Sequence, residues 1–574
     1  LKGITPGLSI TQDNGQPGSG TSVNIRGMGT IGHSEPLYVV DGVVVGDIDY
    51  LNPSDIETID VLKDAASAAI YGSRAANGVI LVTTKKGSSG QKIVVNYSGY
   101  YGVQNIYRQL DMLDAQQYME IMDEGNVNRG QEPYNWETKV PANTWEKLQN
   151  GWKGTNWIDE VAMENAPIKS HSISAAGAEE SVIYSFGASH IDQKGIIGGD
   201  IIDAGFKRTT LRLNTEFILF KNKRHNVFKI GQNLTYMASE NKRIADGNIY
   251  WNDLRHAIRS TPLQPVYDEN DGDKYNYSAP YDQIAIYMTN PIATMWYDRA
   301  HNWDPQDKVI GNVYAELEPI KNLKIKSVYG IDWWSGLHRS YSEIFDLGAG
   351  MSRVEDAVEM RMNKGKNWQW TNTISYNQSF GVHNFALVLG HEMRRYQLDY
   401  NVGGNANNSI FEKPEYGYLD LMKDPEDVTK LGTWGTDGAA GGGGLMSYFG
   451  RVSYDYKEKY LLTGVLRADG SSNFAKDKRW GYFPSVSAGW IFTKEDFMAS
   501  TSNFVNFSKI RFSWGQNGNE RIDNFIYSST ISYSDERYYF GADKITSAVV
   551  SYPARVPNPD VAWETSEQLN FGLD

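Results

Sequence analysis

The sequence predicts a mainly β protein in which a small N-terminal α/β domain precedes a long transmembrane antiparallel β-barrel. Three observations predict it: apolar residues recur at every second position, short and long connections alternate, and 13% of the 574 residues are aromatic. The mean hydropathy of −0.49 suits a soluble chain, and no apolar run is long enough for a transmembrane helix. A membrane barrel needs an apolar side chain only at alternate positions, so this low hydropathy is compatible with one.

The N-terminal region reads as a compact mixed domain. Asp41-Gly42 between two valine-rich runs predicts a tight hairpin. Asn52-Pro53 predicts the start of a helix, because Ile56, Ile59 and Leu62 repeat with helical spacing. The other expected elements are a strand at Val23 to Arg26, a short helix at Asp64 to Tyr71 and a strand at Val79 to Thr84. A polar joint from Lys85 to Gly90 then predicts a boundary between a domain of residues 1–90 and a barrel of residues 91–574.

After this joint the hydrophobic period changes to two. In one example, Leu211, Leu213 and Phe217 alternate with Arg212, Asn214 and Glu216. The same pattern recurs in Ile93 to Val103, Ser181 to His190 and Trp368 to Tyr376. Each segment therefore predicts a strand with one apolar and one polar face.

The connections between these strands differ in length. Phe220 to Asn226 and Phe380 to Asn384 are brief polar turns, whereas roughly 70 residues separate Ser239 from Lys308 and roughly 50 separate Arg394 from Leu445. Short turns at one end and long loops at the other are typical of an outer-membrane barrel. A soluble sandwich or propeller predicts more even spacing.

The composition excludes several kinds of chemistry. With no cysteine, the chain has no disulfide or thiolate chemistry. The net charge of −14 argues against nucleic acid as a partner. The nine histidines are scattered, and no HExxH, GxSxG or P-loop pattern occurs. We therefore expect no catalytic residues, no cofactor and no metal site, and we expect that the protein is not an enzyme.

Several stretches resemble SusC/RagA-type TonB-dependent outer-membrane transporters. VNIRGMGT, PLYVVDGV and LNPSDIETIDVLKDAASAAIYGSRAANGVILVTTKKG are similar to the plug domain of that family. RADGSSNFAKDKRWGYFPSVSAGW, KIRFSWGQNGN and NPDVAWETSEQLNFGLD are similar to its barrel. The resemblance extends from the first residues to the last.

This resemblance implies a barrel of 22 strands with the N-terminal domain as a plug in its lumen. It implies a Bacteroidetes-type outer membrane, energy coupling by TonB, a SusD-like surface lipoprotein as a lid, and a possible dimer of transporter–lipoprotein pairs. The implied cargo is an oligosaccharide, with peptides as the alternative. We identify no TonB box or N-terminal extension, and we expect further C-terminal strands in the functional protein, because a barrel open to lipid leaves unpaired strand edges.

The resemblance also suggests contact residues. Arg26 and Arg74 are candidates for ion pairs between the plug and barrel carboxylates, and surface positions are the alternative. Aromatic residues in or beside the long loops are candidates for stacking on cargo, and membrane-girdle or packing roles are the alternative. These residues are Trp251, Trp296, Tyr297, Trp333 and Trp334.

A soluble secreted β protein that binds polysaccharide stays as a lower alternative. It shares the excess of aromatic residues, with 36 Tyr and 16 Trp. It requires even loop lengths and extraction without detergent, and the loop lengths already disagree with it.

Overall fold

The computed structural model describes most of the chain. It covers residues 3–574 except 4, 13, 28–29, 31–33, 88–89, 91, 248–251, 269–289, 348–351, 422–431, 437–441, 502–503, 524–525, 530, 541–545 and 554. All structural statements below concern the residues that it covers.

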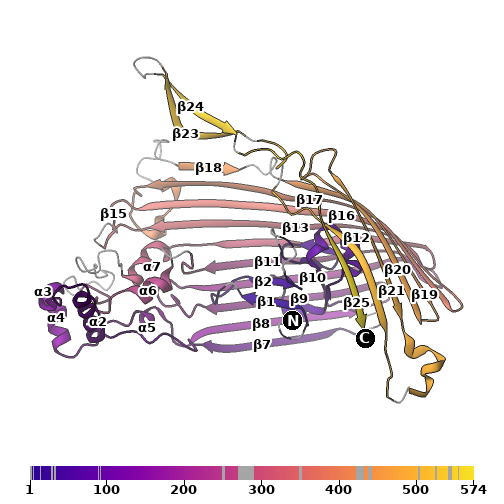
Figure 1. Cartoon of the computed structure of the whole chain (residues 1–574), viewed down its shortest axis with the longest axis horizontal. Helices are drawn as coiled ribbons and strands as arrows, with labels where there is room; N and C mark the ends of the chain where they lie inside the picture. The colour runs from indigo at the N-terminus through magenta and orange to yellow at the C-terminus, as the bar shows by residue number, and fades with distance from the viewer. Residues whose placement is uncertain are drawn as a thin grey trace.

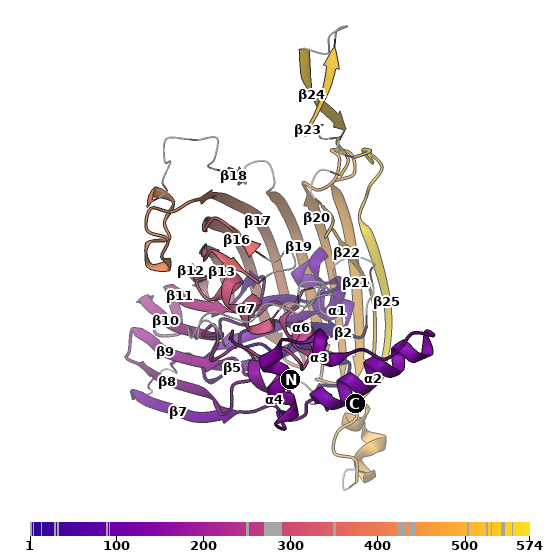
Figure 2. The same cartoon turned by 90° about the vertical axis from the view of Figure 1, so that its left-hand side faces the viewer.

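One large antiparallel sheet of 15 strands forms a curved wall (Figures 1 and 2). In chain order its strands are β7 (Val94–Gln104), β8 (Ala166–Ala178), β9 (Val182–Lys194), β10 (Gly205–Lys221), β11 (Asn226–Lys242), β12 (Pro305–Ile320), β13 (Leu323–Ser342), β16 (Ala357–Phe380), β17 (His383–Asn407), β18 (Gly432–Thr436), β19 (Gly443–Tyr456), β20 (Tyr460–Ser471), β21 (Trp480–Trp490), β22 (Ile510–Asn519) and β25 (Glu564–Leu573). Neighbouring strands follow chain order, with β7 at one edge and β25 at the other, and β18 pairs only with β17.

The N-terminal region forms sheets of its own, which are not hydrogen-bonded to the wall strands, and lies within the curve of the wall (Figure 2). It has a hairpin of β1 (Leu8–Gln12) and β2 (Thr21–Ile25) and a four-stranded sheet in the order β4-β3-β6-β5. The sheet strands are β3 (Leu37–Val40), β4 (Val43–Val45), β5 (Ile56–Leu62) and β6 (Val79–Thr84). Its apolar core also includes Met237 and Ile310 of the wall. We call residues 3–84 the plug.

The polar face of the wall is turned toward the plug and its apolar face outward, which is the reverse of a soluble β protein. On β10, Leu211 and Leu213 are each 41% exposed, whereas Arg212 and Asn214 between them are 2% and 4% exposed. The polar face therefore packs against the plug, and the apolar face points outward. The alternation expected of barrel strands is thus present. The apolar face points outward, whereas in a soluble sandwich the apolar faces pack inward.

The wall has two distinct ends. The predicted short turns are confirmed: β10 joins β11 through residues 222–225, and β16 joins β17 through residues 381–382. Long connections occupy the other end, which is the extracellular end in a barrel of this kind. They hold α2 (Ala115–Asn128), α3 (Trp136–Lys139), α4 (Ala142–Gln149), α5 (Trp157–Val161), α6 (Asp253–Arg259), α7 (Pro291–Arg299), β14 (Phe345–Asp346), β15 (Ser352–Arg353), η4 (Pro414–Tyr416), η5 (Leu419–Leu421), β23 (Ile531–Phe540) and β24 (Thr546–Pro553). No described helix has the length and apolar character needed to cross a membrane.

Two sequence expectations need correction, and one feature was not predicted. The helix expected from Asn52 to Leu62 is only a 3₁₀ turn, η1 (Pro53–Asp55), followed by strand β5. Spacing alone did not distinguish the two, because β5 gains its hydrogen bonds from β6, which is distant in the sequence. The β17–β19 connection is shorter than expected, since β17 continues to Asn407. The β7–β8 connection, residues 105–165, holds four helices that were not predicted.

Other local expectations are confirmed. Asp41 and Gly42 turn between β3 and β4, with φ of +48° and +86°. The segment Asp64 to Tyr71 contains α1 (Ala65–Ala68) and the 3₁₀ turn η2 (Ala69–Tyr71). A further 3₁₀ turn, η3 (Ser73–Asn77), precedes β6.

Candidate functional site

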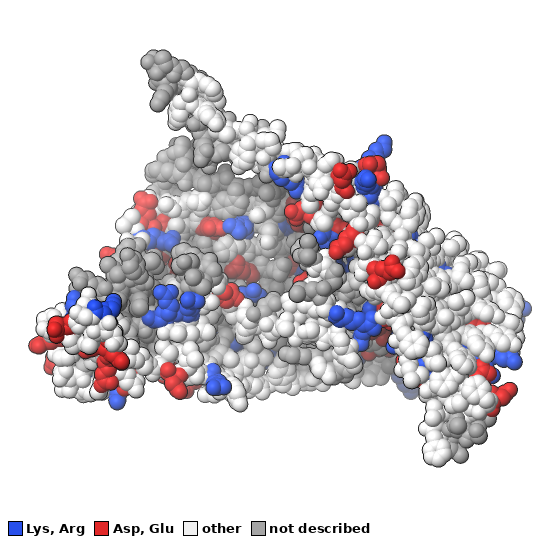
Figure 3. Space-filling view, in the orientation of Figure 1, with Lys and Arg blue, Asp and Glu red and all other residues white. Residues whose placement is uncertain are grey.

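The interface between the plug and the wall is rich in charged and polar groups. On the hollowed face in Figure 3, Lys and Arg side chains lie among Asp and Glu side chains. The strongest contacts connect residues far apart in the sequence and come from the inward-facing positions of the wall strands.

A buried ion pair fixes the plug to β10. The Asn52 side chain accepts from the Ser54 amide and so caps η1, which places Asp55 at the inner surface of the wall. The Arg212 Nη2 lies 2.9 Å from Asp55 Oδ1, and the two side chains are 1% and 5% exposed. Arg212 also donates to the Lys85 carbonyl at 2.9 Å and to Ser185 Oγ at 2.8 Å. The guanidinium therefore joins the end of the plug to two wall strands.

Gly187 of β9 provides the space for this ion pair. A Cβ at this position would lie 2.6 Å from Asp55 Oδ1, whereas a Cβ at Gly464 of β20 would have no heavy atom within 4 Å. We expect Gly187→Ala to weaken plug docking by about 1–3 kcal/mol, the usual cost of overpacking. Hydrogen exchange of the β5 amides should accelerate roughly 5- to 100-fold, and Gly464→Ala should leave it unchanged. Equal exchange in both variants would contradict this role for Gly187.

The β3–β4 hairpin is held by wall amides. Gln369 of β16 accepts from the Val44 amide at 2.9 Å and donates to the Gly42 carbonyl at 2.8 Å. Asn312 of β12 donates to the Asp41 carbonyl at 3.1 Å. The Asp41 side chain accepts from the Thr84 hydroxyl at 2.6 Å, so Asp41 also joins β6 to the hairpin.

A lysine of the wall contacts carboxylates of both the plug and the wall. Lys308 Nζ of β12 lies 2.9 Å from Asp47 Oδ2 of the plug and 4.0 Å from Asp332 Oδ1 of β13. The ring of Tyr50, which is 2% exposed, lies below the same ammonium group. Burial and the carboxylates Asp332 and Asp47 raise the pKa of Tyr50 well above its usual value. Tyr50 therefore stays neutral here.

Arg74, predicted from the sequence, lies directly against the wall. Its Nε is 3.1 Å from Glu520 Oε1, and its guanidinium carbon is 4.1 Å from the centre of the Tyr396 ring. Burial alone would lower the pKa of Arg74, but Glu520 and Tyr396 outweigh it and raise the pKa. Arg521 is the residue after Glu520, and it donates to the backbone carbonyl of Glu35 in the plug at 2.6 Å. Burial and the nearby Arg74 lower the pKa of Arg521 to about 10.

Arg26, the second predicted residue, has a different set of partners. Its ion pair is within the plug, 2.7 Å to Asp64 Oδ1, and its wall contact is the neutral amide oxygen of Asn570 at 2.9 Å. Asp64 is in turn 3.4 Å from Arg511 of β22. The carboxylate at this place thus belongs to the plug, and the cation that faces it across the interface belongs to the wall.

Arg467 of β20 was not predicted as a contact residue. It is 1% exposed, donates to the Ile70 carbonyl of the plug at 2.7 Å and pairs with Asp469 at 2.8 Å. Gly72 of the plug, at φ +85°, packs directly against its guanidinium. Arg212 and Arg467 share one signal in the sequence, a charged residue on the polar face of an alternating strand. That signal does not indicate which plug residue each one meets.

The predicted aromatic residues occupy different environments. Trp334 is on the inward face of β13, whereas Trp333 points outward together with Ile331 and Tyr329. Tyr297 of α7 is 9% exposed and stacks on Phe345 at 4.5 Å, and the half-buried Trp296 packs edge-on to His301. Trp251 lies outside the described residues. The placement of Trp333 matches the girdle alternative, and that of Tyr297 matches loop packing.

A cavity of about 820 Å³ lies between the plug and the extracellular connections. The plug supplies residues 14–17, which form the turn between β1 and β2. The connections supply residues 105–110, 195–197 and 244–246 and the α6 side chains Leu254 and Ile258. Gln16 bonds the backbone of Ile244, and Arg243 donates to the Gly18 carbonyl at 2.7 Å. Plug and loops therefore contact each other directly beside this cavity.

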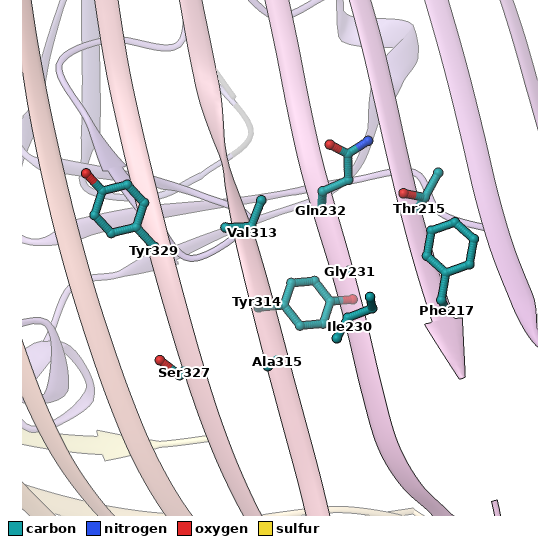
Figure 4. A pocket seen from close by; sticks show the side chains of 10 residues that line it. All are labelled: Thr215, Phe217, Ile230, Gly231, Gln232, Val313, Tyr314, Ala315, Ser327 and Tyr329. Atoms are coloured by element: carbon teal, nitrogen blue, oxygen red, sulfur yellow. The ribbon is translucent and has the colours of Figure 1, made fainter. Parts of the chain in front are cut away.

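A second depression, of about 520 Å³, lies among strands β10 to β13 (Figure 4). Its lining includes Phe217, Ile230, Val313 and Tyr329. These four side chains are 38–57% exposed and belong to the outward face, on the opposite side from the plug. This depression is therefore part of the lipid-facing surface and is no candidate for a cargo site.

Metal chemistry has no evident place in the part of the chain that the structure describes. No group of three or more His, Cys, Asp or Glu side chains there has the arrangement to hold a metal ion. The buried carboxylates named above each have arginine, lysine or hydroxyl partners. These pairs hold the plug and the wall together.

Comparison with known proteins agrees with this architecture. Residues 1–79 match the family model TonB-dependent Receptor Plug Domain. The whole chain is 28% identical to TonB-dependent receptor SusC of Bacteroides thetaiotaomicron and 29% identical to TonB-dependent receptor P26 of Formosa agariphila, covering 55% and 54% of those proteins. The chain thus spans about half the length of these curated relatives. Among solved structures, the RagAB peptide transporter superposes with a TM-score of 0.82 at 22% identity, covering 99% of this chain and 62% of that one.

A plug domain enclosed by a wall with an outward apolar face is the architecture of a TonB-dependent outer-membrane receptor. The protein is thus a β-barrel protein of the outer membrane. Within that class the chain is of the SusC/RagA type, as its similarity to SusC-like receptors along its whole length and its fold show. The relatives are receptors and transporters rather than enzymes.

Proposed function

We propose that the full-length protein imports a nutrient across the outer membrane by TonB-dependent movement of the plug. One observation carries this proposal: the plug is attached to the wall largely by ion pairs and side-chain hydrogen bonds. Such contacts are directional and re-form in water, so they hold a movable part in place and can be exchanged for water when it is pulled. A purely structural filler would be expected to pack through an apolar surface instead.

The moving unit in this proposal is the domain of residues 1–90, and residues 91–574 contribute the surrounding barrel. Arg74 holds the plug to Glu520, and Arg26 orients Asp64 toward Arg511. TonB, reached from the periplasm, supplies the pull. Because the two plug–wall contacts, Arg74 with Glu520 and Asp64 with Arg511, lie on the β22 side, we infer that this side of the plug is released separately from the side held by Asp55.

The cargo we propose first is an oligosaccharide, and a peptide is the second candidate. Cargo would enter the 820 Å³ cavity, where apolar side chains lie beside Asn14, Gln16 and Arg108. Trp334 and Trp296 are the aromatic residues we propose for cargo contact, because sugar rings stack on aromatic faces. The peptide alternative is favoured by the structural likeness to a peptide transporter.

A SusD-like lipoprotein is the partner we propose at the extracellular end. The β23–β24 hairpin projects from this end (Figures 1 and 2) and exposes Ile531, Tyr538 and Phe540 by 57–66%. A two-stranded hairpin is marginally stable in water by itself and gains stability from a protein that covers it. A dimer of transporter–lipoprotein pairs is the assembly we propose.

Filling the cavity should block uptake. Leu254 and Ile258 are one helical turn apart on α6 and are each 37% exposed at the cavity. We expect Leu254→Trp with Ile258→Trp to reduce uptake of labelled cargo at least tenfold in cells, with unchanged receptor abundance. Leu462→Trp, on the outward face of β20, is the matched control. Unchanged uptake in the cavity variant would show that cargo does not pass through this site.

The chemical class of the cargo is tested separately. Molecules that co-purify with the detergent-extracted receptor are identified by mass spectrometry, and growth is compared on purified glycans and on peptides. Deletion of the partner lipoprotein or of TonB should abolish growth on one of these classes. Unchanged growth on every glycan, together with peptide in the purified receptor, would replace the oligosaccharide by the peptide.

A further inference from the structure

The outward face of the wall carries a long uncharged band. On β16, outward positions from Phe380 up to Trp368 hold no Lys, Arg, Asp or Glu. These twelve steps span roughly 40 Å of strand, which a tilt of about 40° reduces to roughly 30 Å. That height matches the apolar band and aromatic girdles of an outer-membrane barrel. The wall at the right of Figure 3 is correspondingly white over most of its surface.

Aromatic residues mark the extracellular limit of this band. Trp333 of β13 and Trp368 and Trp370 of β16 all occupy outward positions near the same level. Tyr329 pairs with Trp370, and its ring stacks with that of Trp368 at 6.1 Å. Tryptophan is enriched where the hydrocarbon meets the headgroups, so the lipid headgroups of the outer leaflet lie directly above these side chains.

Three cations occupy outward positions beside these tryptophans, toward the extracellular end of the strands. Lys366 pairs with Trp333, Lys364 pairs with Ser335, and Arg395 of β17 pairs with Trp368. Lys364 and Lys366 are two residues apart on one strand, about 7 Å, and Arg395 is a diagonal neighbour of Lys366, about 7–8 Å away. All three are exposed. Their side chains are therefore long enough to reach one common anion.

No carboxylate balances these cations in the described part of the chain. None of the three forms an ion pair there, unlike Arg361 on the same strand, which is 3.0 Å from Glu359. The nearest acidic residues belong to the inward face: Asp399 is paired with Gly365, between the two lysines, and lies on the side of Trp334. Asp332 is buried, and Glu392 lies 3.6 Å from Arg467. The surrounding outward positions are Ser335, Leu337, Met362, Met393, Tyr400 and Met446. The positive charge therefore faces the membrane without a protein counter-ion.

We propose that Lys364, Lys366 and Arg395 bind a phosphate group on the headgroup of an outer-leaflet membrane lipid, whose acyl chains lie against Trp368 and Trp370. Arginine offers two parallel donors to a phosphate, and the two lysines add charge from the neighbouring strand. Basic residues at headgroup depth attract anionic lipids by about 1 kcal/mol each, which is about fivefold in affinity. This site is on the outside of the barrel and is independent of the proposed transport function.

The test uses the full-length receptor in nanodiscs of phosphatidylcholine. Monophosphoryl lipid A is titrated in, and the bound fraction is measured by native mass spectrometry, with the dephosphorylated glycolipid as the neutral probe. We expect the triple variant Lys364→Gln, Lys366→Gln and Arg395→Gln to bind the phosphorylated lipid on the order of 100-fold more weakly. Its binding of the neutral glycolipid should not change.

The matched control removes three exposed cations from the periplasmic turns of the same wall: Lys223→Gln, Arg224→Gln and Lys457→Gln. This variant should keep the affinity of the unaltered receptor, as should Lys366→Arg. Equal loss in both triple variants, or no loss in the first, would overturn the site. Competition by millimolar inorganic phosphate alone would overturn the assignment to a lipid. Heat-modifiable electrophoretic mobility, unchanged in every variant, verifies that each barrel is folded.

Discussion

Replacement of Asp55 by alanine is expected to weaken the docking of the plug by about 3–5 kcal/mol. Arg212 is 2% exposed and would stay buried beside β9 and β10 without the carboxylate that pairs with it. Its remaining bonds, to the Lys85 carbonyl and Ser185, are to neutral groups and do not replace the lost charge. The measurement is hydrogen exchange of β5 and β6 amides in the detergent-solubilised receptor, which should accelerate at least 100-fold.

Two further variants separate the loss of this ion pair from the loss of any carboxylate in the plug. Asp60→Ala removes an exposed carboxylate from β5, the strand that follows Asp55, and should leave exchange unchanged. Asp55→Ala combined with Arg212→Met removes both charges and should recover much of the docking free energy, since an unpaired buried charge costs more than the missing pair. A double variant as poorly docked as the sum of the two single variants would refute the ion-pair explanation.

The wall was predictable because its information is local. Alternation along β10 alone identifies a strand and its two faces, and similar segments repeat along the chain. The unequal lengths of the connections between these segments then indicate an outer-membrane barrel. The hairpin at Asp41-Gly42 was predictable for the same reason, because two residues determine the turn. The plug helix expected at Asn52 to Leu62 was wrong because β5 depends on β6, whose strand begins after three intervening helical turns.

A local signal in the sequence marks the start of α2. Asp114 and Gln117 form a capping box before α2, with the Gln117 amide 2.9 Å from Asp114 Oδ1 and the Asp114 amide 3.0 Å from Gln117 Oε1. That spacing, followed by Tyr118, Met119 and Met122, is a readable helix start. The helix α2 in the first long connection could therefore be predicted from the sequence.

The residue pairs across the plug–wall interface could not be predicted from the sequence. Asp55 and Arg212 are 157 positions apart, and Arg467 and Ile70 are 397 apart. Any of several inward-facing residues on each strand has the chemistry to make these contacts, and only the curvature and register of the whole sheet select one. Arg26 illustrates this: it was expected to face a wall carboxylate, and the structure pairs it with Asp64 of the plug itself.

Covalent attachment of the plug to the wall should abolish transport in the proposed mechanism. The chain contains no cysteine, so an introduced pair has no competing thiol in it. A Cβ at Gly330 of β13 would lie 3.0 and 3.2 Å from the two methyl carbons of Val43 in the plug hairpin. Those methyl carbons mark where the sulfur of a cysteine at position 43 would lie, and about 3 Å suits a disulfide across this gap. We expect Val43→Cys with Gly330→Cys to cross-link spontaneously in the oxidising environment of the cell envelope.

Uptake by this double variant should fall to background and return when a membrane-permeant reductant opens the bond. Val43→Cys alone removes little volume and should retain uptake. Gly330→Cys alone brings a side chain against Val43 and measures the cost of that crowding without the bond. Gln369 and Asn312 already hold the β3–β4 hairpin against the wall through hydrogen bonds, which water can replace. The disulfide adds a covalent bond at the same place, which water cannot replace. Full uptake with a quantitatively formed disulfide would mean that cargo passes while the hairpin stays against β13. The movement would then be restricted to the side of the plug held by Arg74 and Asp64, where the contacts to Glu520 and Arg511 remain free to break.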